Sequence, residues 1–510
     1  MFGELIDLKY KMILSKSEFM MFLKHPAWLW LKKHDKSKIP EPDENLRALF
    51  DDGNLFESYA EKLFPDAVTL GYKINGIFNG NRYKVLPELT KKELQKDTKV
   101  IFQGRFEVDN LTAIFDVLER VGDNTFDLYE IKSSTSVKPE HIPDLAFQTI
   151  VLEKSGLKIR NLYVIHVNNN YVRKGDIDPM KLCSEKEDVT KDVREIIGET
   201  LNNIGEAFKI INMKNMPDVS PRHLKQGSME EWLEVYKLVN GEFPKYCMYN
   251  LCGLTAKKVG LLEDMGVKLI NEVPPDFELT ERQQQQVTAL KEGRQINIKE
   301  ISDFLSKFEY PLHFFDYETF SGVIPAFDGI RPYQQVPFQY SLHILDKQGG
   351  ELIHKEYLHT ENSNPVPTLV KKMMEDFEGK GTVLVWHESM EKGKNEQMAK
   401  MFTEYEPFLL NINDRILDLK IPFSKGWFTD ADFFGSASLK AVAPVIISKP
   451  SYSDLKISNG VTAQRVWMET VFQGKNKETK DKIMEDMRKY CGLDTEIMVH
   501  ILKVLESKIN

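Results

Sequence analysis

The chain has 510 residues, of which 42% are apolar and 11% aromatic, and its formal net charge is −9. This composition excludes a disordered chain and is typical of a folded protein with more than one core. No apolar run approaches the roughly 20 residues that span a bilayer, and the apolar stretch FMMFLKHPAWLWLKK lacks a signal-peptide cleavage site. Four irregularly spaced cysteines argue against a disulfide framework. We therefore expect a cytoplasmic protein with no membrane-spanning segment.

Up to residue 45 the sequence predicts a basic amphipathic helix followed by a proline-containing linker, IPEPDEN. Around Trp28 and Trp30 the helix carries eight lysines: Lys9, Lys11, Lys16, Lys24, Lys32, Lys33, Lys36 and Lys38. Two interpretations stay open for this stretch. It is either a solvated helix with one apolar face or a phosphate-contacting edge of a nearby site.

The next part of the chain, to about residue 215, predicts one α/β domain. After a helix around Gly53 to Phe64, the segments KVIFQGRFEV and TAIFDVLERV flank an Asp109–Asn110 turn, a pattern typical of a hairpin. FDLYEIKSS and NLYVIHVNN predict two further strands, with an amphipathic helix over 140–155 between them. Residues 216–300 look helical and polar, so we expect a linker there.

From residue 301 strands and helices alternate again. The predicted strands are LHFFDYE, FQYSLHILD, ELIHKEYLH, TVLVWHE and RILDLK, and the end of the chain after GSASLK is mainly helical. The expected fold class is α/β, with two mixed-sheet domains (1–215 and 301–510) joined by a mainly helical linker (216–300).

Two pairs of polar residues in the last part of the chain converge by local geometry. Asp316 and Glu318 are two apart on a predicted strand, so both point to one face. Tyr490 and Asp494 are four apart on a predicted helix and stack on one side. Clustered carboxylates need a cation, and hard oxygen ligands suit Mg²⁺ or Mn²⁺. This arrangement suggests two-metal hydrolysis of phosphodiesters.

A second candidate site lies in the first α/β domain. Glu130 and Lys132 alternate onto one strand face, and Asp116 lies on a neighbouring strand. The two acids are candidate ligands for a divalent ion, while the lysine is suited to stabilise developing negative charge. Glu57 precedes these residues on a helix, and Gln148 follows on the next one. An ordinary Glu–Lys ion pair on a partly exposed strand is the simpler alternative.

The order of these elements resembles the RecB-like branch of the PD-(D/E)xK nucleases, which includes the CRISPR-associated exonucleases. The resemblance implies a restriction-endonuclease-like fold, with Asp116 and Glu130 as metal ligands, Lys132 as the catalytic lysine and Gln148 as the helix glutamine near the substrate. Two positions depart from the pattern. Many relatives have histidine where Glu57 falls, and often tyrosine where this chain has Leu152.

Many of these relatives also bind an iron–sulfur cluster through one early cysteine before a proline and three later ones. Here His25 stands in the early position, before Pro26, and Cys247 and Cys252 have no third cysteine near them. Cys183 is expected to be structural, and Cys491 belongs to the helix of the other candidate site. Since thiolate ligation normally takes four cysteines, we expect no cluster.

Residues 301–510 resemble the DEDD exonucleases of the RNase H-like fold, the group that contains the DnaQ-type proofreading domains. The resemblance implies Asp316, Glu318 and Asp494 as metal ligands, and Tyr490 as the phenol that positions the attacking water. For the middle acid, Glu391 stands where relatives usually have aspartate, and Asp418 is the alternative.

A predicted loop, IPAFDGIRPYQQVPFQY, follows the strand that carries Asp316 and Glu318. Its Arg331 and aromatic residues are suited to hold a nucleotide end by charge and stacking. A surface loop over the sheet is an equal alternative.

Both halves, together with SLKAVAP and YCGLDTEIMVHIL, resemble a bacterial family that fuses a RecB-like nuclease to a DEDD-type domain of unknown function. The resemblance implies a metal-dependent nuclease with a nucleic-acid partner, more readily DNA than RNA, that acts in repair or defence. A ribonuclease is one alternative. A nucleic-acid-binding scaffold with decayed sites is another, because of Glu391 and the missing cysteines.

Overall fold

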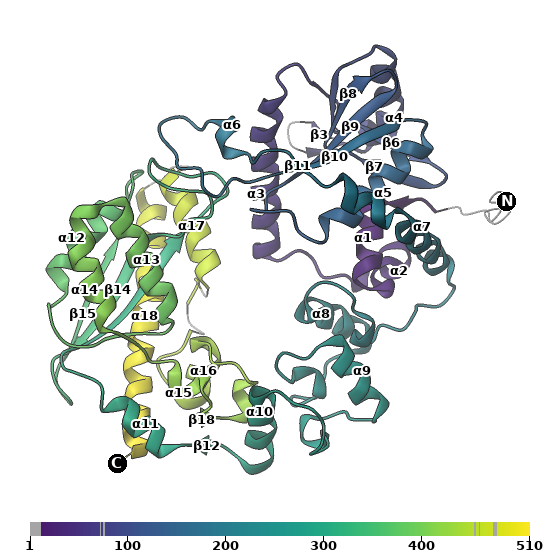
Figure 1. The fold of residues 1–510 in the computed structure, drawn as a ribbon. Helices are drawn as coiled ribbons and strands as arrows, with labels where there is room; N and C mark the ends of the chain where they lie inside the picture. The colour runs from purple at the N-terminus through teal and green to yellow at the C-terminus, as the bar shows by residue number, and fades with distance from the viewer. Residues whose placement is uncertain are drawn as a thin grey trace. The chain divides into compact units, whose positions relative to one another are not determined.

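The computed structural model describes residues 12–71, 73–74, 77–452, 455–457, 459–472 and 477–509. The chain divides into two compact units (Figure 1). Unit 1 is Met1–Glu242 with Thr255–Gly260, and unit 2 is Phe243–Leu254 with Leu261–Asn510. Each unit combines helices with a mixed sheet, which confirms the predicted α/β class with two sheet domains. Lys9 and Lys11 of the basic stretch lie outside the described residues.

Unit 1 contains short strands and longer helices. The strands are β1 (Leu14–Ser15), β2 (Val68–Thr69), β3 (Lys73–Ile74), β4 (Ile77–Phe78), β5 (Val100–Phe102), β6 (Arg105–Val108), β7 (Leu111–Ile114), β8 (Val117–Gly122), β9 (Thr125–Lys132), β10 (Lys158–His166) and β11 (Glu187–Asp188). The α-helices are α1 (Lys16–Lys24), α2 (Pro26–His34), α3 (Glu44–Ala60), α4 (Gly80–Gln95), α5 (His141–Lys154), α6 (Pro179–Leu182), α7 (Thr190–Asn212) and α8 (Met229–Asn240). Helix α9 (Ala256–Asp264) is divided between the units after Gly260.

The elements of unit 2 complete the chain. The strands are β12 (Gln295–Ile296), β13 (Leu312–Phe320), β14 (Val336–Leu345), β15 (Leu352–Leu358), β16 (Val383–Val385), β17 (Ile416–Asp418) and β18 (Phe428–Thr429). The α-helices are α10 (Glu281–Glu292), α11 (Ile298–Leu305), α12 (Val366–Asp376), α13 (Glu388–Met401), α14 (Glu406–Arg415), α15 (Ile421–Ser424), α16 (Leu439–Ile446), α17 (Gly460–Phe472) and α18 (Lys477–Ile509).

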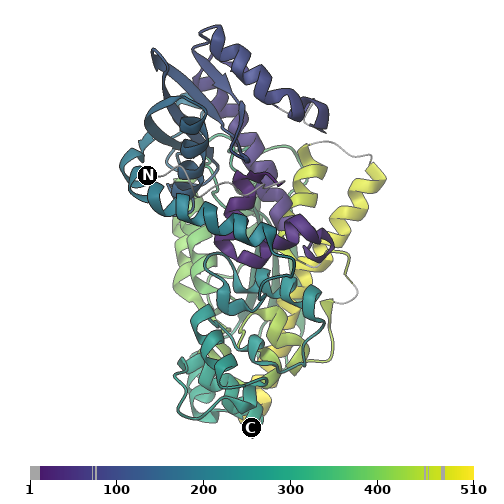
Figure 2. The ribbon, with the colours of Figure 1, turned by 90° about the vertical axis from the view of Figure 1, so that its right-hand side faces the viewer.

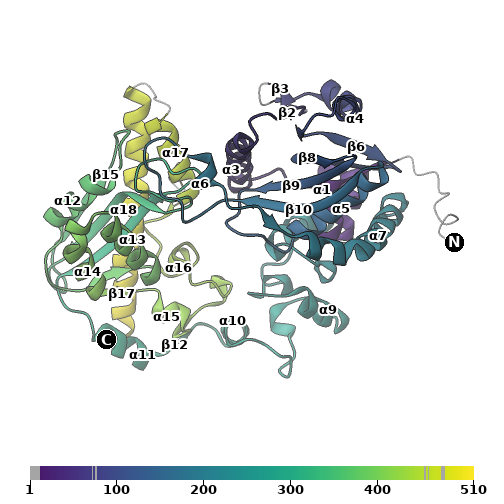
Figure 3. The ribbon, with the colours of Figure 1, turned by 45° about the horizontal axis from the view of Figure 1, so that its top comes forward.

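The main sheet of unit 1 has six strands in the order β11-β10-β9-β8-β5-β2. Strands β9 and β10 pair in parallel, and β8 pairs with both β9 and β5 in the antiparallel sense. Helix α5 packs on β10 and on α7, so these two helices cover one face of the sheet (Figure 3). The parallel pairing follows from the chain path, because α5 is the crossover between β9 and β10.

The segment KVIFQGRFEV forms two strands, β5 and β6, that belong to different sheets. Strand β6 pairs with β7 in a hairpin whose turn residues Asp109 and Asn110 have φ of +49° and +62°, as the turn sequence predicted. The change of sheet occurs at Gln103, where φ is +52°, and Gly104. A Cβ on Gly104 would lie 2.3 Å from the ring of Phe115, so only glycine fits there.

The predicted single N-terminal helix is wrong, because two helices occupy the stretch. Helix α1 ends at Lys24 and α2 begins at Pro26, with His25 extended between them at φ −157°. Proline cannot donate the backbone hydrogen bond that a continuous helix needs, whereas it suits the first position of a new one. The Nδ1 of His25 accepts a hydrogen bond from the amide of Ala27 and so caps α2.

The ring of His25 also ties α2 to the region after α7. Its Nε2 donates to the carbonyl of Ser220 at 3.0 Å, and the ring stacks on Trp232 with centroids 3.8 Å apart. Trp232 belongs to a small core that joins α8 to Ala27 and Trp28 of α2. This packing explains why residues 216–242 belong to unit 1, whereas the sequence predicted a separate linker from 216 to 300.

We expect His25 to make unit 1 sensitive to acid. Burial, with a smaller contribution from nearby His223, lowers the pKa of His25 to about 4, although the Ser220 carbonyl and Asp218 act the other way. The folded ring stays neutral while the unfolded ring gains a proton below its ordinary pKa of about 6.5. Stability is therefore lost as pH falls from about 6.5 towards 4, by about 3 kcal/mol in total.

The measurement is the free energy of unfolding in urea, at several pH values, for wild type and His25→Gln. Glutamine can accept from Ala27 and donate to Ser220 but does not titrate, so the slope between pH 6.5 and pH 4 should become shallower. An unchanged slope would contradict this prediction.

The main sheet of unit 2 has the order β15-β14-β13-β16-β17. Strands β13, β14 and β15 are antiparallel neighbours, and β16 and β17 run parallel to β13. The two faces of β13 enter different cores. Phe315 packs with residues of α12, α13 and α14, whereas Phe314 packs with residues of α11, α16 and α18. The long helix α18, in yellow, lies beside α17 (Figure 2).

Across the helices that the structure describes, none is both long enough and apolar enough to cross a lipid bilayer.

Candidate functional site

The central strand of unit 2 presents two carboxylates on its α18 face. Asp316 and Glu318 alternate with Phe315 and Tyr317, so they share the face of β13 that carries Phe314. Glu318 is buried, and ligand atoms of Asp316, Glu318 and Cys491 all lie within 4.8 Å of one another. The sequence predicted that Asp316 and Glu318 point to one face of the strand, and the structure has them so.

Helix α18 brings Tyr490 and Asp494 to the same place. Asp494 is buried and accepts a hydrogen bond from the hydroxyl of Tyr452. The Nζ of Lys440 donates to the hydroxyl oxygen of Tyr490 at 3.0 Å. The sequence did not indicate Tyr452 or Lys440, because no local pattern connects these residues to α18.

The two candidates for the middle acid, Glu391 and Asp418, have different surroundings in the structure. Glu391 is buried on α13, and its Oε1 accepts from Lys394 Nζ at 2.9 Å. Its Oε2 is buried without a hydrogen-bond partner in the described part of the chain. Asp418 instead accepts from the amides of Glu388 and Lys420 at 3.2 and 2.9 Å. Asp418 therefore satisfies the backbone amides of Glu388, the first residue of α13, and of Lys420, which precedes α15, and Glu391 is the better candidate.

Electrostatics show that the acids of this cluster act on one another. Burial, and then the charges of Glu391, Asp494 and Glu318, raise the pKa of Asp316 well above its ordinary value. Burial and Asp494 raise the pKa of Glu318 to about 8. Burial raises the pKa of Asp494 to about 6, although Tyr452 and Lys440 act the other way. Such a cluster is costly to ionise without added positive charge.

A hard divalent cation suits the residues of this cluster. Its donors are carboxylate oxygens from β13, α13 and α18, which are the ligands that Mg²⁺ and Mn²⁺ prefer. The unpartnered Oε2 of Glu391 is an acceptor that the protein itself leaves unsatisfied.

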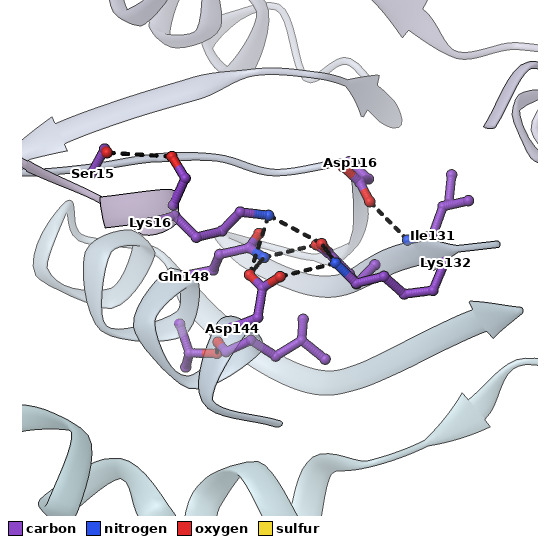
Figure 4. Close-up of polar contacts among 11 residues, drawn as sticks. Ser15, Lys16, Asp116, Ile131, Lys132, Asp144 and Gln148 are labelled. Carbon is purple, nitrogen blue, oxygen red and sulfur yellow. Dashed lines mark hydrogen bonds and ion pairs between the residues drawn. The ribbon is translucent and has the colours of Figure 1, made fainter. Parts of the chain in front are cut away.

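The candidate site of unit 1 is a compact network of acids and lysines (Figure 4). Glu130 is buried at the end of β9, and its Oε1 accepts from Lys132 Nζ at 2.7 Å and from Lys16 Nζ at 3.0 Å. Its Oε2 accepts from Gln148 Nε2 at 2.7 Å. The structure thus brings together Glu130, Lys132 and Gln148, which the sequence had grouped.

Asp116 lies beside Glu130 because of the β8–β9 register. Val117 pairs with Tyr129, so the preceding residue comes next to Glu130, and Asp116 Oδ2 accepts from the amide of Ile131 at 2.8 Å. Burial and the charge of Glu130 raise the pKa of Asp116 well above its ordinary value. Asp116 and Glu130 therefore form a repelling pair, as expected for two ligands of one cation.

Sequence reasoning missed Asp144, which has as many contacts as Glu130. Its Oδ1 lies 3.1 Å from Lys16 Nζ and accepts from Gln148 Nε2 at 2.9 Å, while its Oδ2 accepts from Lys132 Nζ at 2.9 Å. Burial alone would raise the pKa of Asp144, but the two ammonium groups hold it well below its ordinary value. The sequence could have indicated Asp144, because it lies four residues before Gln148 and so on the same side of α5.

In the sequence, Lys16 is one of eight lysines of the basic N-terminal stretch and was not singled out among them. In the structure, its side chain belongs to this site. Strand β1 pairs in parallel with β7, and Ser15 begins α1 with a capping box to Glu18. Lys16 is therefore the first residue of α1. Burial alone would lower its pKa, but Asp144 and Glu130 raise it. The sequence signal was the capping box S-x-x-E before an apolar run.

A pocket of about 560 Å³ opens over the acids of unit 1. It is lined by Lys16, Leu49, Phe50, Gly53, Asn54, Glu57, Asp116, Glu130, Ile131, Lys132 and Ser133. Glu57 comes from α3, and its Oε1 accepts from Gln103 Nε2 at 2.6 Å. Leu49 and Phe50, also on α3, are exposed. The pocket therefore joins charged groups to apolar surface, a combination suited to a nucleotide.

Two further predicted positions have different surroundings. Arg331 is exposed in the loop between β13 and β14, and its backbone amide donates to Gln334 Oε1 at 3.1 Å. Leu152, at the position of the relatives' tyrosine, is fully buried in the core of unit 1. Leu152 therefore serves packing, and a contact of Arg331 with a nucleotide stays a prediction.

The fold and these two sites define the class, an α/β protein with two separate clusters of carboxylates and lysines. Residues 313–438, which include Asp316, Glu318, Glu391 and Asp418, match a family described as a domain of unknown function, DUF2779. The chain is also similar to a protein named uncharacterized protein MG366 of Mycoplasma genitalium, with 27% identity over 216 residues. That match covers 38% of this chain and 32% of the relative, so it spans about a third of the relative's length.

Proposed function

We propose that the chain is a metal-dependent nuclease that hydrolyses DNA phosphodiesters, with a 3′–5′ exonuclease site in unit 2 and a PD-(D/E)xK-type site in unit 1. The observation that carries the proposal is the convergence of Asp316, Glu318, Glu391 and Asp494 from three elements beside Tyr490. The sheet of unit 2 supports it, because three antiparallel strands followed by two parallel ones, with the acids on the central strand, agree with an RNase H-like topology.

In unit 2 the candidate ligands of a divalent ion are Asp316, Glu318, Glu391 and Asp494. In unit 1 they are Asp116 and Glu130. When bound, Mg²⁺ or Mn²⁺ supplies positive charge next to the phosphate and acidifies water.

Tyr490 is suited to direct the attacking water. Its hydroxyl oxygen accepts from Lys440, so its own proton is left to donate to a water or a phosphate oxygen. Burial, and then Asp494 and Glu318, raise the pKa of Tyr490, so it stays a donor at neutral pH. The buried Lys394 holds Glu391 through a hydrogen bond to its Oε1.

In unit 1 the ammonium group of Lys132 is placed to stabilise charge on a phosphate. Burial alone would lower the pKa of Lys132, but Glu130, Asp144 and Asp116 raise it well above its ordinary value. Lys132 is therefore a cation throughout the neutral range and serves as an electrostatic group instead of a general base.

The test uses purified full-length protein with end-labelled single- and double-stranded DNA and RNA, in Mg²⁺, Mn²⁺ or EDTA. Wild type is compared with Glu130→Ala, Asp316→Ala and the double variant. We expect metal-dependent cleavage that each single variant reduces in part and the double variant abolishes. Tight binding without cleavage by wild type would point to a scaffold, and cleavage of RNA alone would point to a ribonuclease.

We expect Tyr490→Phe to lower turnover at the unit 2 site by roughly 10²-fold, the scale of one lost proton donor in the transition state. Its KM and its affinity for Mn²⁺ should stay close to wild type, because the phenol is not a candidate ligand. The measurements are steady-state kinetics on 3′-labelled DNA and a Mn²⁺ titration followed by electron paramagnetic resonance, both in the Glu130→Ala background. A loss of Mn²⁺ affinity would instead assign Tyr490 a role in shaping the cluster.

A further inference from the structure

We propose that Lys16 is a second phosphate-binding lysine of the unit 1 site, and that Asp144 positions Lys16 and Lys132 side by side for that purpose. The inference deepens the proposed function of this site and rests on it. Lys16 lines the 560 Å³ pocket together with Lys132, and their side chains are 22% and 25% exposed. Both side chains are therefore partly accessible from the pocket.

The two lysines share their acceptors. Both Lys16 and Lys132 donate to the same atom of Glu130, Oε1. Each also faces one oxygen of Asp144, Lys16 at Oδ1 and Lys132 at Oδ2 (Figure 4). Asp144 thus bridges the ammonium groups of two lysines that line the same pocket.

Asp144 and Glu130 differ in what else they can do. Glu130 is a candidate metal ligand, so its oxygens are not reserved for the lysines. Asp144 has the same three partners as Glu130, namely Lys16, Lys132 and Gln148, but it does not line the pocket, which leaves it as the anchor of the pair. An ammonium group has three donors, and two of those of Lys16 are used by Glu130 and Asp144. A third donor is left for a phosphate oxygen.

A separate observation is an unsatisfied acceptor beside the two lysines. The side-chain oxygen Oε1 of Gln148 is buried and has no hydrogen-bond partner in the described part of the chain. Gln148 is fully buried, and its Nε2 already binds Glu130 and Asp144. Buried acceptors are rarely left unsatisfied in folded proteins.

Charge indicates which ligand Lys16 serves. The pocket is lined by three carboxylates, Glu57, Asp116 and Glu130. Asp144, which contacts the lining residues Lys16 and Lys132, adds a further negative charge beside them. Whatever number of cations binds there, removing Lys16 makes the site more negative by one charge. This change favours binding of a cation and opposes binding of a phosphate. A phosphate-binding role and a purely structural role of Lys16 therefore predict different effects on DNA binding.

The test is the equilibrium binding of a fluorescein-labelled single-stranded oligonucleotide to the full-length Asp316→Ala protein, followed by anisotropy. Ca²⁺ replaces Mg²⁺ to slow cleavage, and KCl is varied. The variants are Lys16→Met, which keeps the apolar stem, Lys16→Arg, which keeps the charge, and Asp144→Asn. Lys24→Met is the matched control, since Lys24 ends the same helix and pairs with Glu231 at 3.7 Å.

For Lys16→Met we expect affinity to fall by about tenfold, as for a lost charge-assisted hydrogen bond, and the salt slope to fall by about 0.7, the value for one phosphate contact on a single strand. Lys16→Arg should keep the slope, Asp144→Asn should weaken binding, and Lys24→Met should resemble the parent. Mn²⁺ affinity of Lys16→Met, measured by electron paramagnetic resonance, should be unchanged or higher.

An unchanged affinity and salt slope in a folded Lys16→Met protein would reduce Lys16 to a structural counter-ion and overturn the inference. Absence of oligonucleotide binding by the parent protein would also overturn it. Binding that depends on Lys16, together with no cleavage by wild type in Mg²⁺ or Mn²⁺, would reject the nuclease proposal while keeping Lys16 as a phosphate ligand.

Discussion

Replacing Asp316 by asparagine is expected to lower metal-dependent hydrolysis at the unit 2 site by roughly 10²- to 10³-fold, the scale of one lost electrostatic group. Asp316 lies on the central strand β13, and its charge interacts with Glu318, Glu391 and Asp494. Asparagine keeps the shape but removes the charge that draws a divalent ion. The measurement is release of 3′-terminal nucleotides in a Glu130→Gln background, which leaves unit 2 as the working site.

The matched control is Asp418→Asn, which changes the other candidate for the middle acid. Asp418 accepts from the amides of Glu388 and Lys420, so its loss should cost about 1 kcal/mol of stability, as for a weakened helix cap. Turnover per folded molecule should stay the same. Equal losses of turnover in Asp316→Asn and Asp418→Asn would mean that the loss is not specific to the carboxylate cluster, and would contradict a role of Asp316 in the reaction.

Glu130→Gln is expected to have two large effects in unit 1. Cleavage by this site should fall by roughly 10²- to 10³-fold, because a candidate ligand loses its charge. The metal-free protein should lose about 3 kcal/mol of stability, because Lys16 and Lys132 each lose one of their two anionic partners in a buried network. Cleavage is measured in the Asp316→Asn background, and stability by urea unfolding in EDTA.

A suitable control for this change is Glu119→Gln on the adjacent strand β8. Glu119 accepts from the hydroxyl of Tyr129 at 2.6 Å and lies 3.9 Å from Lys186, outside the pocket. We expect a small loss of stability and normal cleavage. If Glu119→Gln lowered cleavage as much as Glu130→Gln, the effect would come from general destabilisation of the sheet.

Local rules predicted much of the fold. The strands β9, β10, β13, β14 and β15 and the helix α5 lie where alternation and helical periodicity place them. The Asp109–Asn110 turn forms with positive φ at both residues. These features depend on neighbours in the sequence, so the pattern of residues is enough to predict them.

Other features of the fold depend on packing between segments that are distant in the sequence, and the local residue patterns did not predict them. At the point where KVIFQGRFEV changes from one sheet to another, Phe115 lies against Gly104. The assignment of residues 216–242 to unit 1 depends on the stack of His25 and Trp232. Neither contact follows from the periodicity of a single segment.

For the candidate sites, the sequence by itself determined which residues share a face of one element: Asp316 with Glu318, Glu130 with Lys132, and Tyr490 with Asp494. A residue's place on a strand or helix follows from its spacing along the chain. Only the tertiary structure added Lys16 and Asp144 and separated Glu391 from Asp418. These residues meet through strand pairing and helix packing between distant segments, and local spacing contains no information about such contacts.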